Sequence, residues 1–168
     1  MEEDIDNYID YKIGDWVETC HFMPGIVQVI DKEEDNVEVY YPHYKEKYPE
    51  YTGGSCCSIM HCGVHKIDAD LAEAFFKVGE ERVKRVYEFL QRNVHIKSLC
   101  DSIKWWKENK EKAKNYHPFY DEKYYDKIIE DYQEKLDDAW GIFDKIYHQT
   151  IKDLANGVIN DTTKGICL

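Results

Sequence analysis

The fold is decided between residues 13 and 41, which read IGDWVETCHFMPGIVQVIDKEEDNVEVYY. The segments 13–19, 26–30 and 37–41 are rich in β-branched and aromatic residues and alternate in polarity, as half-buried strands do. A Pro-Gly pair separates the first two segments, and an acidic stretch separates the last two. We therefore expect three short strands, with the second and third paired as a hairpin.

The β-type pattern continues as far as residue 67. The tyrosine-rich segment 42–54 is expected to be a long loop, and the runs 58–62 and 64–67 are expected to supply one or two closing strands. Four to five short strands within about 55 residues are typical of a small closed or partly open barrel.

Residues 11–67 resemble the SH3-like and Tudor-like small barrels. The resemblance rests on a Gly-Asp-x-Val opening strand at 14–17, a Pro-Gly turn at 24–25, the strand Gly-Ile-Val-Gln-Val-Ile at 25–30 and the strand Val-Glu-Val-Tyr at 37–40. It implies a barrel and often a ligand surface, but no particular activity. The segment 42–54 is longer than the turn that these barrels usually have there, so the resemblance does not locate the binding groove.

Beyond residue 67 the apolar period changes from two to about 3.6 residues, which indicates helices. Helices are expected from a cap at Asp68 or Asp70 to Gly79, and over 80–93, 96–115 and 121–156. The expected fold class is α+β, a small SH3-like β-barrel followed by a C-terminal helical bundle with a long last helix. The expected domains are an acidic N-terminal segment (1–10), the barrel (11–68), the bundle (69–156) and a flexible tail (157–168).

The last helix carries apolar residues at alternating steps of four and three, which is a heptad stripe. A wide stripe favours packing inside a bundle, whereas a heptad repeat favours self-association, so a homo-oligomer through residues 121–156 stays open as an alternative. The stripe consists of Tyr125, Ile129, Tyr132, Leu136, Ala139, Phe143, Ile146 and Thr150.

The formal charge of -12 comes mainly from residues 1–76, while residues 77–114 carry a basic excess. An acidic surface repels phosphate backbones and attracts basic proteins, so the expected partner is a protein with a basic surface and nucleic acid is disfavoured. No apolar run approaches the roughly 20 residues of a membrane span, and the N-terminus has no apolar signal segment. We therefore expect a cytoplasmic protein with reduced cysteines and no membrane partner.

Aromatic and acidic side chains crowd the strands and the segment after them. Aromatic faces and carboxylates together suit recognition of a cationic side chain. The alternative is that Trp16 and alternate tyrosines fill a small core. The predicted binding residues are Trp16, Phe22, Tyr40, Tyr41, Tyr44, Tyr48, Glu46 and Glu50.

Cysteines and histidines gather in the same part of the chain. Thiolates and imidazoles are zinc ligands, and the candidate metal set is Cys20, His61, Cys62 and His65, or a subset with Cys56. The alternative is that these cysteines are small buried hydrophobes. A nucleophile, Cys57 or Cys62 with His61 or His65, is a further hypothesis, but Cys57 leads into a β-type run rather than starting a helix whose dipole would activate the thiolate.

The function predicted from the sequence is that of a non-catalytic binding or regulatory protein. It would recognise a basic protein surface through its acidic, aromatic-rich barrel, and no cofactor is needed for that role. The alternatives are a small cysteine-dependent hydrolase and a zinc-stabilised interaction module, in which zinc would be held by the cysteine and histidine cluster.

Overall fold

A computed structural model describes residues 11–31, 36–51, 55–58, 64–116 and 122–159 of the chain. The chain is an α+β protein with a small antiparallel sheet in its N-terminal part and helices in its C-terminal part. Its contacts divide it into two compact units, residues 1–83 and residues 84–168, which are described separately below. The first unit therefore includes one helix of the region 69–156, which was predicted to form the bundle.

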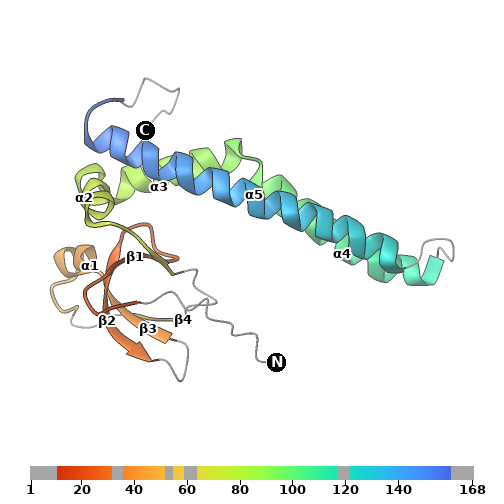
Figure 1. The fold of residues 1–168 in the computed structure, drawn as a ribbon, viewed down its shortest axis with the longest axis horizontal. Coiled ribbons are helices and arrows are strands. Elements are labelled where there is room, and N and C mark those ends of the chain that lie inside the picture. The colour runs from red at the N-terminus through yellow and green to blue at the C-terminus, as the bar shows by residue number, and fades with distance from the viewer. Residues whose placement is uncertain (1–10, 32–35, 52–54, 59–63, 117–121, 160–168) are drawn as a thin grey trace, which may run out of the picture. The chain divides into compact units, whose positions relative to one another are not determined.

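The sheet of the first unit has five antiparallel strands in the order β4-β3-β2-β1-β5. Figure 1 labels the strands β1 to β4. Among the described residues, β4 and β5 form opposite edges and are not paired with each other, so the sheet is open. The strands expected near 13–19, 26–30 and 37–41 are confirmed, and the second and third form the expected hairpin. The bounds are β1 (Trp16–Glu18), β2 (Gly25–Asp31), β3 (Asn36–Tyr40), β4 (Ser55–Ser58) and β5 (His65–Lys66).

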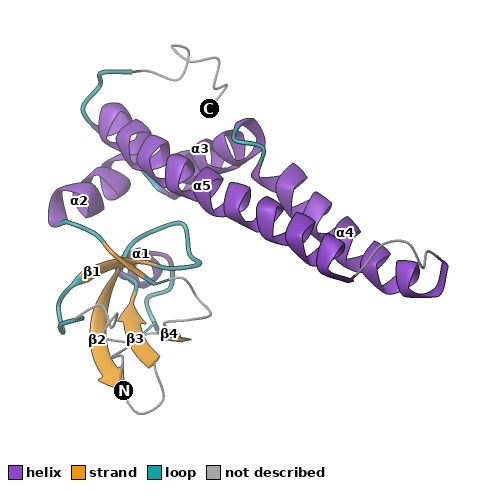
Figure 2. Ribbon diagram, turned by 45° about the vertical axis from the view of Figure 1, so that its right-hand side comes forward, coloured by secondary structure: helices purple, strands orange, loops and turns teal. Residues whose placement is uncertain are grey.

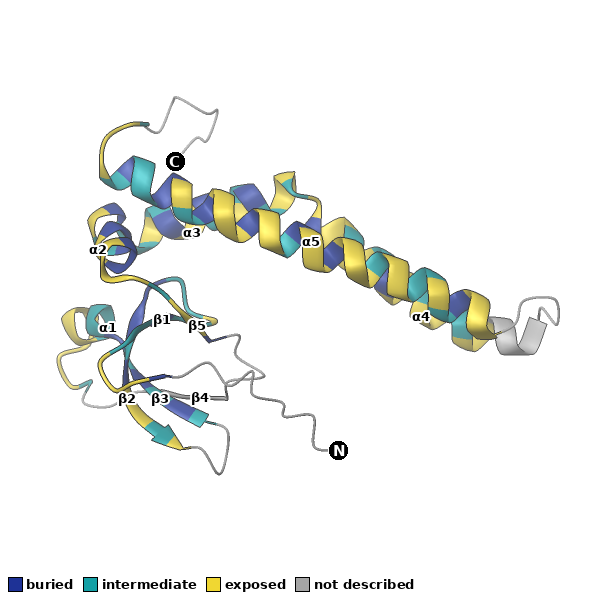
Figure 3. Cartoon of the chain, viewed as in Figure 1, coloured by how far each residue is buried: buried dark blue, intermediate teal, exposed yellow. Residues whose placement is uncertain are grey.

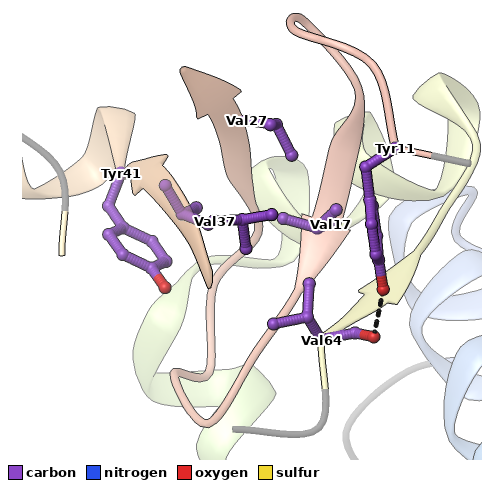
Figure 4. Packing of buried hydrophobic residues seen from close by; sticks show 7 residues of the cluster. Tyr11, Val17, Val27, Val37, Tyr41 and Val64 are labelled. Carbon is purple, nitrogen blue, oxygen red and sulfur yellow. Dashed lines mark hydrogen bonds between the residues drawn. The ribbon is translucent and has the colours of Figure 1, made fainter. Parts of the chain in front are cut away.

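Alternation along the strands builds the core of the first unit. In β3 the side chains of Val37 and Val39 are buried, whereas their neighbours are half-buried. The Tyr11 hydroxyl donates a hydrogen bond of 2.7 Å to the Val64 carbonyl, which ties the start of the described chain to the segment before β5 (Figure 4). The buried cluster consists of Tyr11, Val17, Val27, Val37, Val39, Tyr41 and Val64.

Gly25 opens β2 at a point where the backbone of β3 comes close. A Cβ atom at this position would lie 2.2 Å from Val39 Cγ1 and 3.0 Å from the Tyr40 carbonyl oxygen. The pairing of β2 with β3 then shifts between Val27 and Val29, as it does at a β-bulge. Glycine is required here because no side chain fits between the two strands.

The segment 42–54 is not wholly a loop, because α1 (Pro42–Lys47) forms directly after β3 (Figure 2). Pro42 occupies the first turn, where its missing N–H is not needed and its fixed φ suits a helix. The expectation of a long loop was therefore wrong for the first half of this segment. A helix of six residues is too short to produce the repeated apolar period by which helices are usually predicted.

The caps expected at residues 68 and 79 are confirmed in α2 (Ala69–Val78). The Asp68 carboxylate accepts a hydrogen bond of 2.6 Å from the Leu71 N–H, and Gly79 ends the helix with a φ of 86°. Leu71, Phe75 and Val78 share one face of this helix and are buried. The next helix, α3 (Glu80–Asn93), has the expected bounds and crosses the boundary between the two units.

The second unit is dominated by α4 (Ile96–Tyr116) and α5 (Glu122–Ala155), which pack along each other (Figure 2). Lys110, near the end of α4, pairs with Asp126 and, at 3.5 Å, with Glu122, both near the start of α5. The two helices are therefore antiparallel. Among the described residues, no helix is long and apolar enough to cross a bilayer.

Most of the predicted stripe on α5 is used inside this unit. Phe143 is 1% exposed, and the Tyr87 ring of α3 meets it edge-to-face at 5.0 Å. Tyr147 stacks on Phe143 at 5.5 Å and also contacts Tyr87. Bundle packing, rather than self-association, thus accounts for these rings. Ile146, in contrast, is 39% exposed.

Candidate functional site

The candidate site lies at the end of β3, where α1 turns the chain back on itself. The Tyr44 N–H donates to the Tyr41 carbonyl at 3.0 Å, and the Tyr48 N–H donates to the Tyr44 carbonyl at 2.7 Å. The Tyr51 N–H then donates to the Tyr48 carbonyl at 2.9 Å. These bonds hold Tyr44, Tyr48 and Tyr51, which are at positions i, i+4 and i+7, on one short and rigid piece of backbone.

Tyr41 anchors this piece to the core. Its side chain is 0% exposed and belongs to the buried cluster drawn in Figure 4. Its hydroxyl shares a hydrogen bond of 2.7 Å with Thr19 Oγ1, just beyond β1. The prediction that Tyr41 is a surface binding residue is therefore corrected, because a ring without exposed area cannot contact a partner.

Tyr44 is the centre of the site. Its hydroxyl shares a hydrogen bond of 3.0 Å with Nδ1 of His21, which lies in the loop between β1 and β2. The His43 ring is 4.2 Å from the Tyr44 ring, and the rings of Tyr48 and Tyr51 are 6.3 Å and 5.8 Å away. We call Tyr44, Tyr48, Tyr51, His21 and His43 the tyrosine site.

Tyr40 extends the tyrosine site along the sheet. Its ring stacks on Tyr51 with centroids 5.6 Å apart, and the Tyr51 hydroxyl accepts a hydrogen bond of 3.3 Å from the Tyr41 N–H. Tyr51 is thus fixed by both neighbours at the end of β3. Aromatic rings in edge-to-face and offset contacts stabilise one another by about 0.5 to 1.5 kcal/mol per pair, so the site is preorganised.

Burial favours the neutral form of three groups in the tyrosine site, His21, His43 and Tyr44. It lowers the pKa of His21, and it also lowers that of His43, where it outweighs the opposing effect of Glu80. Burial raises the pKa of the Tyr44 hydroxyl. His43 Nδ1 is buried without a hydrogen-bond partner among the described residues. Burial therefore works against a positive charge on either histidine.

The edge of the tyrosine site is charged and open to solvent. Tyr48 is 47% exposed, and Glu46 and Glu50 beside it are exposed as well. Lys47 Nζ lies 3.6 Å from Glu80 Oε2 and 6.0 Å from the centre of the Tyr48 ring. The ammonium group of Lys47 is therefore within cation–π distance of one face of the Tyr48 ring.

The structure gathers only some of the predicted binding residues. Tyr40, Tyr44, Tyr48, Glu46 and Glu50 lie at or beside the tyrosine site. Phe22 is half-buried in the loop that carries His21. Trp16 is half-buried, and its ring packs edge-to-face on Phe76 of α2 at 5.7 Å.

His21, His43 and Glu80 were not among the predicted binding residues. A sequence signal for His43 existed, because Tyr-Pro-His-Tyr at 41–44 combines a strand end with a helix-starting proline. No signal linked His21 or Glu80 to Tyr44, since their proximity comes from strand pairing and from the start of α3.

The predicted metal ligands are only partly within the described residues. Cys20 is exposed just after β1, and His65 is exposed in β5, opposite Glu18. Cys56 lies in β4 opposite Glu38, whereas His61 and Cys62 lie outside the residues that the structure describes. Within the described ranges, no group of three or more His, Cys, Asp or Glu side chains could hold a metal ion. The zinc site therefore stays a prediction.

The proposed nucleophile Cys57 lies in β4, opposite Val37. A strand provides no helix dipole to activate a thiolate, so the backbone around Cys57 lacks the feature that cysteine hydrolases rely on. The hydrolase hypothesis gains no support from this position.

Comparison of the chain with protein-family models, with curated proteins and with solved structures found no match.

Proposed function

We propose that the chain is a non-catalytic binding protein whose first unit recognises a basic surface of another protein. The observation that carries the proposal is the tyrosine site, a rigid aromatic cluster in which Tyr48 is 47% exposed and is flanked in the sequence by the exposed residues Glu46 and Glu50. Aromatic residues that are held in place lose little conformational freedom on binding, which is why interfaces are rich in them.

The chemistry of the site favours a cationic side chain as the group that is bound. Lys47 Nζ lies 6.0 Å from the centre of the Tyr48 ring, in the range of a cation–π contact. A lysine or arginine of a partner can occupy the other face of this ring and pair with Glu46 or Glu50. The lowered pKa of His21 and of His43 removes the positive charge that would repel such a group.

We further propose that the first unit is an SH3-like barrel. The strand order supports this assignment, because β5 returns to pair with β1 on the side away from β2. The strands β1 to β4 lie side by side in chain order, and β5 returns to pair with β1. A sheet with this connectivity can curl into a small barrel.

The test uses immobilised peptides that contain lysine and arginine, with acidic and neutral peptides of equal length as controls. Tyr48→Ala should weaken binding of the basic peptides by about 1 to 3 kcal/mol, because it removes the exposed ring. Tyr124→Ala is the matched control, since Tyr124 is 48% exposed but lies on α5 in the second unit. Equal effects of the two substitutions would overturn the assignment of the site.

Charge reversal tests the same surface independently. Glu46→Lys and Glu50→Lys should mainly slow association and flatten its dependence on salt, because exposed charges at the rim of an interface steer the encounter. Binding that is indifferent to both reversals, or stronger for acidic peptides, would contradict a basic partner.

A further inference from the structure

The outer face of α5 carries a pair of exposed isoleucines, away from the apolar residues that are buried in the second unit. Ile142 is 53% exposed and Ile146 is 39% exposed, although the adjacent Phe143 and Tyr147 are buried. Figure 3 shows exposed residues recurring along the visible face of α5. Two neighbouring isoleucines one helical turn apart thus face solvent on a helix that already buries its other side.

Two charged residues continue this line of the helix at both ends. Lys135 lies seven residues before Ile142, and Asp153 lies seven residues after Ile146. At 3.6 residues per turn, all four positions fall within about 40° of one another around the helix axis. We call these four residues, Lys135, Ile142, Ile146 and Asp153, the outer stripe.

Along the sequence, the four residues of the outer stripe are placed symmetrically on either side of position 144. Its two isoleucines lie two residues from that centre and its two charged residues lie nine residues from it, which is about 14 Å along the axis. If a second α5 helix is related to the first by a two-fold axis that passes at the level of residue 144, each residue of the outer stripe faces a complementary residue of the other helix. Ile142 meets Ile146, and Lys135 meets Asp153.

We propose that the outer stripe is the docking surface for a second copy of this chain, with the two α5 helices antiparallel. The two-fold contact buries four isoleucines at its centre and forms a Lys135–Asp153 ion pair at each end, as an isologous interface requires. A parallel arrangement would place Lys135 against Lys135 and Asp153 against Asp153. Charge complementarity therefore selects the antiparallel dimer.

Present contacts leave the charged ends of the outer stripe within reach of a partner. Lys135 is exposed, with Nζ 5.2 Å from the centre of the Tyr132 ring on the same helix. Asp153 is half-buried and accepts a hydrogen bond of 2.7 Å from Gln149 Nε2, also on α5. A carboxylate has lone pairs for further donors, so this bond does not prevent pairing with a second chain.

The first test is the concentration dependence of the mass of the full chain, measured by analytical ultracentrifugation. The wild-type chain should shift from monomer to dimer as its concentration rises, and Ile142→Glu with Ile146→Glu should abolish the shift. Ile13→Glu is the matched control, because Ile13 is 72% exposed but lies in the first unit. A wild-type chain that stays monomeric at all concentrations, or a control that also abolishes the dimer, would overturn the proposal.

The second test exchanges charges and reports the orientation. Lys135→Asp alone and Asp153→Lys alone should each weaken the dimer about tenfold or more, because each places like charges face to face at both ends. The doubly exchanged chain should dimerise like the wild type, and a mixture of the two single variants should form a heterodimer.

Circular dichroism should show unchanged helix content in every variant, since all the altered side chains reach solvent. Single variants that dimerise like the wild type, or a double variant that does not recover, would overturn the antiparallel arrangement.

Discussion

Replacing Tyr41 by alanine should unfold or severely destabilise the first unit while leaving the second unit helical. The ring of Tyr41 is 0% exposed, and removal of a buried aromatic ring costs about 3 to 5 kcal/mol. That loss is a large fraction of the free energy of unfolding of a typical domain, which is roughly 5 to 15 kcal/mol. Tyr48→Ala, at 47% exposure, should change the free energy of unfolding by only about 0.5 kcal/mol.

A milder change separates the hydroxyl from the ring. Tyr41→Phe keeps the ring but removes the 2.7 Å hydrogen bond with Thr19 Oγ1. We expect a loss of about 0.5 to 1.5 kcal/mol, the usual net value of such a bond. Since Thr19 is only half-buried and can bond to water instead, the lower half of this range is the expected result.

The assay is urea denaturation followed by nuclear magnetic resonance, with the amides of Val27 and Val39 reporting on the first unit. The amides of Phe143 and Ile151 report on the second unit and serve as the internal reference. If Tyr41→Ala left the midpoint at Val27 and Val39 unchanged, the assignment of Tyr41 to the core would be refuted. A loss as large for Tyr48→Ala would refute the distinction between the two tyrosines.

Two glycines and two half-buried histidines offer further tests. Gly25→Ala should destabilise the first unit by about 1 to 3 kcal/mol, because its Cβ would lie 2.2 Å from Val39 Cγ1; thermal denaturation measures this. Gly141→Ala should stabilise α5 by about 0.5 to 1 kcal/mol, since the new methyl group meets nothing within 4 Å in the middle of the helix; an unchanged or lower melting temperature would contradict this. The pKa values of His21 and His43 are lower in the folded protein than in the unfolded chain, so both histidines bind protons more weakly in the folded state. The stability that they contribute is therefore complete above the unfolded pKa of 6.5 and is lost as the pH falls below it. His21→Gln should reduce the decline of the melting temperature between pH 7 and pH 5.

The helices could be predicted closely because their signals are local. Asp68 caps the Leu71 N–H and Gly79 takes a positive φ, so both ends of α2 are encoded within a few residues. The apolar period of about 3.6 residues is repeated over the whole length of α5, and it therefore predicts this helix. The short helix α1 was missed because six residues display no repeated apolar period, although Pro42 and the spacing of Tyr44, Tyr48 and Tyr51 are compatible with a helix.

The location of Tyr41 could have been predicted by extending the alternation of β3. Val37, Val39 and Tyr41 are two residues apart, and all three are 0% exposed. The composition of the tyrosine site is different, because the bond between His21 and Tyr44 joins residues that are 23 positions apart. Such a contact depends on how β1, β2 and β3 pair, and a single sequence contains no direct record of that pairing.

Nuclear magnetic resonance titration of the full chain with a lysine- and arginine-containing peptide tests whether the tyrosine site binds a basic protein surface. We expect saturable shifts at Tyr44, Tyr48 and Tyr51, together with the imidazole signals of His21, and no comparable shifts along α4 and α5. Saturable shifts confined to the α4–α5 hairpin would contradict the claim. So would a tyrosine site whose signals stay unchanged at peptide concentrations that saturate the rest of the chain.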